Sequence, residues 1–109
     1  MIEVRRIYDG LNKDNFNVFV DRLYPRGVKK ENFNNVLWAK DLTPSSELRK
    51  AYHKKEISFK EFSDSYFKEL NENRDLSFLK GKDIVLLTAV KDIDKSHIPT
   101  LLKYLNENL

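Results

Sequence analysis

The stretch Asn-Val-Phe-Val-Asp-Arg-Leu-Tyr-Pro-Arg-Gly at Asn17–Gly27 decides the fold, because it begins as a strand and ends in a turn. The residues Val18–Val20 are β-branched or aromatic, which favours a buried strand. Pro25–Gly27 then stops the strand, since proline has no N–H for the ladder and glycine permits a sharp reversal. Two arginines around a rigid proline indicate an anion site. The alternative is a surface turn in which Asp21 and Arg22 pair with neighbouring charges.

Length and composition predict one globular domain over residues 1–109. A hydrophobic fraction of 40% and an aromatic fraction of 12% are sufficient for a packed core. The absence of cysteine excludes disulfides and thiolate catalysis and fits a reducing compartment. With only His53 and His97 as further candidate ligands, we expect no transition-metal site and no cofactor. We also expect a cytoplasmic protein, because no apolar stretch is long enough for an export signal or a membrane span.

The charge balance is mildly basic. Twenty Lys and Arg residues face 17 Asp and Glu residues, which gives a formal net charge of +3. Dedicated nucleic-acid binders usually cluster their basic residues more strongly. Nucleic acid is therefore a candidate partner only if the fold brings the basic groups together.

Four segments have the apolar character of strands, and the last is the clearest: Ile2–Tyr8, Asn17–Leu23, Val36–Ala39 and Asp83–Val90. The near-continuous apolar run of the last segment implies burial on both faces, as at the centre of an α/β sheet. Asp9-Gly10 favours an antiparallel hairpin between the first two strands, although a loop of about eight residues weakens that signal.

Capping patterns predict the helices. Thr43, followed by proline, opens a helix over Pro44–Lys54. Ser58 and Glu61 form a capping box for a second helix that runs to about Asn73. The aromatic stripe on that helix indicates core packing rather than a cofactor site.

Ser96 is the expected cap of the final helix, with Pro99 in its first turn. The order of elements is strand, strand, several helices, central strand and helix. This order predicts a small single α/β domain, with a short and mostly parallel sheet packed by helices.

In such folds ligands collect beyond the carboxyl ends of the strands. Charged groups follow three of the predicted strands: Asp21, Arg22 and Arg26; Lys40 and Asp41; Lys91 and Asp92. His97 lies at the start of the last helix, where an anion is favoured. We therefore expect these groups to converge on one site.

Within that site we expect Arg22 and Arg26 to clamp an anion bidentately, while Lys40 and Lys91 add positive charge. If a reaction occurs, the general acid–base candidates are Asp21, Asp92 and His97.

Each group also has a structural explanation. Arg22 can pair with Asp21 or Asp92 and hold loops together, the lysines can be solvated strand ends, and His97 can cap or pack. Trp38 is expected to pack in the core rather than form a binding platform. The isolated glycines exclude Walker and Rossmann phosphate loops, and no Gly-x-Ser-x-Gly elbow is present.

The sequence resembles the YeaO-like family, also called domain of unknown function 488, a set of small bacterial and archaeal proteins. Spaced motifs carry the resemblance over nearly the whole chain: Val20–Gly27, Trp38–Ser45 with Leu48–Lys50, Tyr66–Leu70, Leu86–Asp92 and Ser96–Ile98. The resemblance implies a cytoplasmic α/β domain of unestablished activity. It strengthens the charged candidates as motif positions without supplying a reaction.

Departures from the family pattern are few. Tyr24 and Ala51 stand where the family commonly has tryptophan, and Thr43 stands where it has alanine. Ser96 and Ile98 replace the asparagine and alanine that flank the motif histidine in the family.

The sequence leads to three hypotheses. The preferred one is a site for a phosphorylated or other anionic ligand, such as a nucleotide or a nucleic-acid end, with or without acid–base chemistry. The second is a non-catalytic binding or regulatory module that recognises a protein or a nucleic acid. The third is a buried ion network that fixes loops. Neither an enzymatic activity nor an oligomeric state follows from the sequence.

Overall fold

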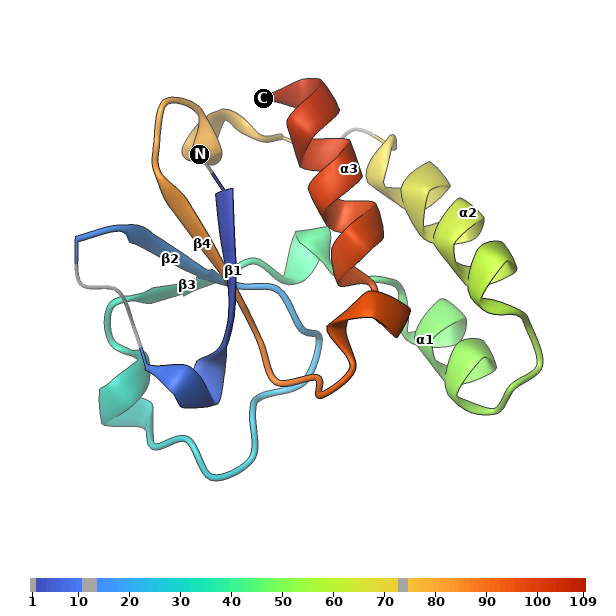
Figure 1. Cartoon of the computed structure of the whole chain (residues 1–109), viewed down its shortest axis with the longest axis horizontal. Coiled ribbons are helices and arrows are strands. Elements are labelled where there is room, and N and C mark those ends of the chain that lie inside the picture. Colours follow the sequence, from blue (N-terminus) through green and yellow to red (C-terminus); the bar gives the residue numbers. More distant parts are fainter. Residues whose placement is uncertain (1, 11–13, 73–74) are drawn as a thin grey trace.

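The computed structural model describes residues 2–10, 14–72 and 75–109, and its strands form one sheet (Figure 1). The four strands are β1 (Ile2–Arg6), β2 (Phe16–Phe19), β3 (Val36–Trp38) and β4 (Ile84–Thr88). All three pairings are parallel, and the order across the sheet is β1-β4-β2-β3. The predicted α/β class is therefore confirmed.

The last strand of the chain lies between the first two. In the ladder, Val4 of β1 and Val18 of β2 both stand opposite Leu86 of β4. The antiparallel hairpin suggested by Asp9-Gly10 is wrong, because β4 separates β1 from β2. Every residue of β4 is buried, so this strand needs a neighbour along each edge as well as a cover on each face.

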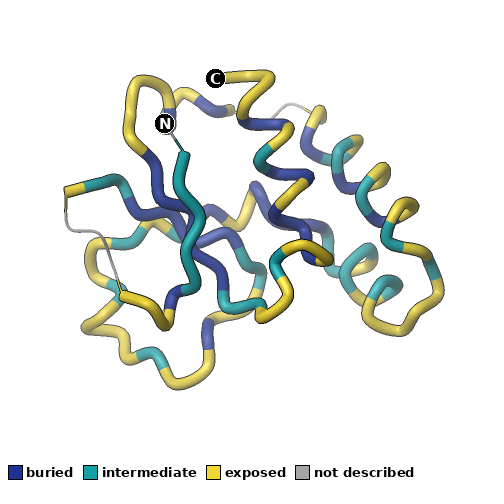
Figure 2. The backbone as a smooth tube through the Cα atoms, in the orientation of Figure 1, coloured by how far each residue is buried: buried dark blue, intermediate teal, exposed yellow. Residues whose placement is uncertain are grey.

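Three helices cover one face of the sheet: α1 (Ser46–His53), α2 (Phe59–Leu70) and α3 (Ile98–Asn108) (Figure 1). Val18 and Leu86 of the sheet share a core with Tyr66 of α2 and Leu101 of α3, and all four are buried (Figure 2). The predicted aromatic stripe on the second helix thus packs in the core.

The other face is covered by irregular chain. Phe19, Val85 and Leu87 point to this side, where Phe33 and Trp38 pack against them. Short 3-10 turns connect the larger elements: η1 (Ile7–Asp9), η2 (Lys30–Phe33), η3 (Lys40–Leu42), η4 (Ser77–Leu79) and η5 (Ile93–Lys95). Successive residues of β2 therefore pack in two different cores, because successive side chains of a strand point to opposite faces of the sheet.

The first helix begins two residues later than predicted. Ser45 is its N-cap, and the Ser45 hydroxyl accepts a hydrogen bond from Leu48 N at 3.2 Å. Thr43 is not the cap, because its hydroxyl donates to Lys40 O at 2.6 Å and closes η3. The η3 turn, which the sequence did not predict, thus uses the Thr43 hydroxyl that was predicted to cap the helix.

The capping box of α2 is confirmed. Ser58 Oγ accepts from Glu61 N at 3.1 Å, and Glu61 Oε1 accepts from Ser58 N at 3.0 Å. The Ser58 backbone N–H, and after it the Ser58 side chain, hold the pKa of the Glu61 carboxyl below its usual range. The helix ends at Leu70, earlier than predicted, and the predicted end at Asn73 lies outside the described residues.

The last helix begins at Ile98, with His97 rather than Ser96 at its N-cap position. The Ser96 hydroxyl accepts from Ile98 N at 3.1 Å and donates to Ile93 O at 2.6 Å. Ser96 therefore joins η5 to α3 and fixes the backbone on both sides of His97. Pro99 lies in the first turn, as predicted.

The described part of the chain holds no helix with the length and apolar character that a membrane crossing needs.

Replacing Ser58 with alanine should lower the free energy of unfolding by about 1 kcal/mol and the melting temperature by roughly 4 °C, because the Glu61 N–H loses its acceptor. The stability of the wild-type protein should also fall as the pH drops below 4.5, the ordinary pKa of Glu61, because the lowered pKa stabilises the fold only while the carboxylate is ionised. The variant should keep most of this pH dependence, because alanine retains the backbone N–H that donates to Glu61. Thermal unfolding at several pH values measures both effects.

Ser63→Ala is the matched control, because the buried Ser63 hydroxyl in the same helix has no hydrogen-bond partner among the described residues. This substitution should leave the stability unchanged or raise it slightly. Equal losses for Ser58→Ala and Ser63→Ala would contradict a capping role.

Candidate functional site

A cavity of about 520 Å³ lies at the carboxyl ends of the strands, and we call it the strand-end pocket. Its walls come from the turn after β1, the segment after β2, helix α1 and the segment after β4. The lining residues are Tyr8, Asp21–Arg26, Pro44, Arg49, Tyr52, His53, Phe62, Ala89, Val90, Asp92 and Lys95–His97.

Asp21 ties the ends of the two central strands together. Its Oδ1 accepts from the Thr88 hydroxyl at 2.7 Å, and its Oδ2 accepts from Ala89 N at 2.8 Å. The backbone carbonyl of Asp21 accepts from Trp38 Nε1 at 2.7 Å, which adds the end of β3. Because the side chain is only 14% exposed, these donors replace the water that a carboxylate would otherwise bind.

His97 belongs to the same network. Its ring is buried, and Nε2 lies 2.7 Å from Val20 O and 3.3 Å from Asp21 Oδ1. A carbonyl oxygen can only accept, so Nε2 carries the hydrogen. The ring also meets Tyr66 edge-on, with 5.9 Å between ring centroids. His97 thus joins the start of α3 to the end of β2.

A second set of bonds holds the segment after β4. The Arg6 guanidinium donates from Nε to Val90 O at 3.0 Å and from Nη2 to Ala89 O at 3.1 Å. The Tyr52 hydroxyl donates to Lys95 O at 2.8 Å and so joins α1 to η5. This part of the pocket wall is therefore fixed by side chains from distant elements.

The arginines of the pocket are much less engaged than Asp21. Arg22 donates from Nε to Pro44 O at 2.9 Å, and its Nη groups make no hydrogen bond or ion pair with the described residues. Arg49 Nε is buried and has no hydrogen-bond partner among those residues. Arg26 is exposed, and within the same part of the chain its side chain makes no ion pair. Guanidinium N–H groups are therefore available to a ligand.

The structure brings most of the predicted site residues together. Asp21, Arg22, Arg26, Asp92 and His97 all line the strand-end pocket. The expected convergence is thus met by the segments after β2 and β4.

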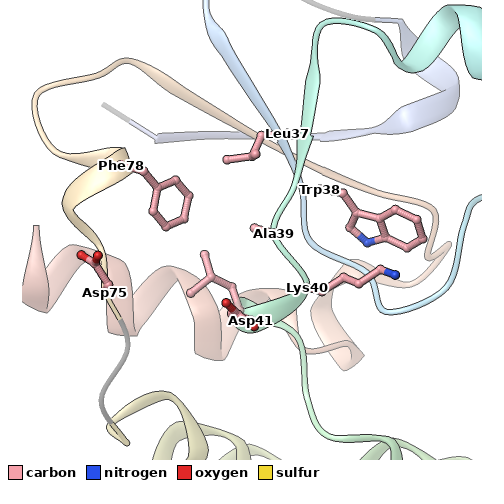
Figure 3. A pocket seen from close by; sticks show the side chains of 8 residues that line it. Leu37, Trp38, Ala39, Lys40, Asp41, Asp75 and Phe78 are labelled. Carbon is pink, nitrogen blue, oxygen red and sulfur yellow. The ribbon is translucent and has the colours of Figure 1, made fainter.

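The two predicted lysines lie elsewhere. Lys40 lines a separate cavity of about 480 Å³, which we call the Trp38 pocket, and its Nζ lies 4.1 Å from the centre of the Trp38 ring (Figure 3). Lys91 is exposed and lines neither of these cavities. The expectation that both converge with the arginines is wrong, because η3 turns the chain away after the edge strand β3 and because Lys91 points into solvent.

Sequence reasoning missed Arg49 and the three tyrosines of the pocket, Tyr8, Tyr24 and Tyr52. The fold places α1 beside the strand ends, and no local pattern reveals where a helix docks. One signal was present, because Arg49 lies within the Leu48–Lys50 motif of the resemblance.

No group of three His, Asp or Glu side chains that could hold a metal ion occurs in residues 2–10, 14–72 and 75–109.

The family model described as the inactive DUF488-N3 subclade matches residues 1–109. The chain belongs to this family. The uncharacterized protein YeaO of Escherichia coli strain K12 is 34% identical over 110 residues, which cover 95% of this chain and 96% of YeaO. The uncharacterized protein Rv3073c of Mycobacterium tuberculosis strain H37Rv is also 34% identical, over 96% of this chain and 93% of its own length. No solved structure matches the chain with statistical significance.

Replacing Asp21 with asparagine should lower the free energy of unfolding by about 1–3 kcal/mol, because the new NH₂ group must face at least one of the donors that the carboxylate now satisfies. Denaturant unfolding measures the loss.

Asp92→Asn is the matched control, because Asp92 lines the same pocket but is exposed. Its effect should stay within about 0.5 kcal/mol. An equal effect of the two substitutions would show that Asp21 does not hold the strand ends.

Proposed function

We propose that the strand-end pocket binds a small phosphorylated or otherwise anionic ligand, of which a nucleotide or a nucleic-acid end is an example. The observation that carries the proposal is that Arg22, Arg26 and Arg49 line one cavity and none of them forms an ion pair among the described residues. A guanidinium without an ionic partner can bind phosphate or carboxylate oxygens through charge-assisted hydrogen bonds.

The charge of the pocket supports this proposal. Its lining includes four cationic residues, Arg22, Arg26, Arg49 and Lys95, against the two acidic residues Asp21 and Asp92. The Asp21 carboxylate accepts from Thr88 and Ala89, and no arginine of the pocket forms an ion pair with it among the described residues. Arginine presents a planar fork of N–H groups that matches the oxygens of a phosphate or a carboxylate.

We further propose that this binding proceeds without turnover. A general base needs an atom that can approach the substrate, whereas both oxygens of Asp21 already accept from a side-chain or backbone donor. The remaining acid–base candidates are Asp92, which is exposed, and Nδ1 of the buried His97 ring, whose Nε2 is held by Val20 O. The description of the family as an inactive subclade agrees with a binding role.

Arg26→Ala should weaken binding of inorganic phosphate about tenfold, because it removes a charge-assisted contact, and should leave the melting temperature nearly unchanged. Arg22→Lys should weaken binding similarly, since lysine keeps the charge but loses the fork. Titration calorimetry and thermal shift with phosphate measure both variants. A ligand at 100 times its dissociation constant stabilises the fold by about 2.7 kcal/mol.

Lys91→Ala is the matched control, because it removes a positive charge next to Asp92 but outside the pocket. Phosphate binding should then change little. The proposal fails if wild-type protein shows no phosphate-dependent stabilisation, or if Lys91→Ala weakens binding as much as Arg26→Ala.

A further inference from the structure

We infer that the ligand of the strand-end pocket is a free small molecule that carries a planar aromatic ring beside its anionic group, in the manner of a nucleoside monophosphate. This inference rests on the proposed function and adds the part of the ligand that the arginines do not contact. The observation behind it is the aromatic and apolar rim of the same pocket.

Exposed apolar side chains gather at this pocket. Tyr8, Leu23 and Tyr24 are 48%, 60% and 38% exposed, and all three line it. The other large apolar side chains that stand exposed in the described residues are Leu37 and Leu109. Exposed apolar side chains that cluster at one cavity with convergent polar groups mark a binding surface, whereas scattered ones do not.

The ring of Tyr8 is held in place before any ligand arrives. Its hydroxyl donates to Arg26 O at 3.0 Å, so the side chain spans from the end of β1 to the turn after β2. The guanidinium of Arg6 lies 5.0 Å from the centre of the same ring. A ring fixed at both its hydroxyl and one face loses little conformational freedom when a second ring stacks on it.

Tyr24 is held by the aromatic cluster on the irregular face of the sheet. Its ring centre lies 5.2 Å from that of Phe33 and 5.8 Å from that of Trp38. The Trp38 ring is itself anchored through its Nε1 hydrogen bond to Asp21 O at 2.7 Å. The backbone carbonyl of Asp21, just beyond the end of β2, therefore helps to position the exposed Tyr24 side chain at the rim.

The two parts of the pocket match the two parts of such a ligand. Arg22 and Arg26 flank Leu23 and Tyr24 in the sequence, so one segment supplies two of the guanidinium groups and two of the three rim residues. Aromatic side chains stack on nucleobases of any sequence, and arginine binds phosphate. A volume of about 520 Å³ is that of a small-molecule site, and an extended basic track for a polymer is not part of it.

The test compares four probes on the wild-type protein by titration calorimetry: inorganic phosphate, ribose 5-phosphate, adenosine 5′-monophosphate and a 5′-phosphorylated deoxyadenosine octamer. Adenosine 5′-monophosphate should bind about tenfold more tightly than ribose 5-phosphate, because only the former can stack. The octamer should bind no more tightly than the monophosphate.

The variant Tyr24→Leu should remove most of this tenfold preference while phosphate and ribose 5-phosphate bind as before. Leucine keeps an apolar side chain at this position, and the melting temperature reports whether the variant remains folded. Leu37→Ala is the matched control, because Leu37 is similarly exposed but lines the Trp38 pocket. It should leave all four affinities unchanged.

Each failure is distinguishable. Equal binding of ribose 5-phosphate and adenosine 5′-monophosphate, both weakened by Arg26→Ala, would overturn the aromatic part and keep the anion site. Tighter binding of the octamer, with a steep loss of affinity as salt rises, would replace the small molecule by single-stranded nucleic acid. No binding of any probe would overturn the proposed function itself.

Discussion

The carboxylate of Asp21 is the interaction on which the rest of the structure depends. The sheet has four short strands, and its central pair, β2 and β4, ends at nearly the same level. Asp21 follows β2 closely enough to accept from Thr88 and Ala89 where β4 ends. With Trp38 on its carbonyl and His97 beside its carboxylate, one residue sets the positions of three strand ends and the start of α3. Because the residue is largely buried, removing any of these partners leaves a polar group without compensation.

This arrangement separates the acidic groups of the pocket from its basic groups. The Asp21 carboxylate accepts its hydrogen bonds from Thr88 and Ala89, while the guanidinium of Arg22 donates to the backbone carbonyl of Pro44. The lining of the pocket carries four cationic residues against two acidic ones, so the pocket has a positive character although the chain as a whole is only mildly basic.

Local patterns predicted those elements whose signals are local. The capping box at Ser58 depends on residues three positions apart, and the apolar run of β4 reports burial directly. The hairpin predicted from Asp9-Gly10 was wrong, because β4 pairs along both of its edges and lies between β1 and β2. No local pattern shows that a strand so distant in the sequence takes that place. At the site, the rule that ligands collect at the carboxyl ends of parallel strands placed Asp21, Arg22, Arg26, Asp92 and His97 correctly on one cavity. The same rule was wrong for Lys40, which follows the edge strand and lines the other cavity. It says nothing about Arg49, whose position depends on how α1 packs beside the sheet.

The proposed binding role fits the way in which the network holds the histidine and the aspartate of the pocket. Nε2 of His97 donates to Val20 O and lies 3.3 Å from Asp21 Oδ1, so the ring is held against the segment that follows β2. Thr88 and Ala89 hold the Asp21 carboxylate in turn, and neither oxygen can change partners without leaving a donor at the end of β4 unpaired. The contacts that stabilise the sheet therefore also fix the two titratable side chains in the pocket wall, and a ligand would meet a wall that is ordered before it binds.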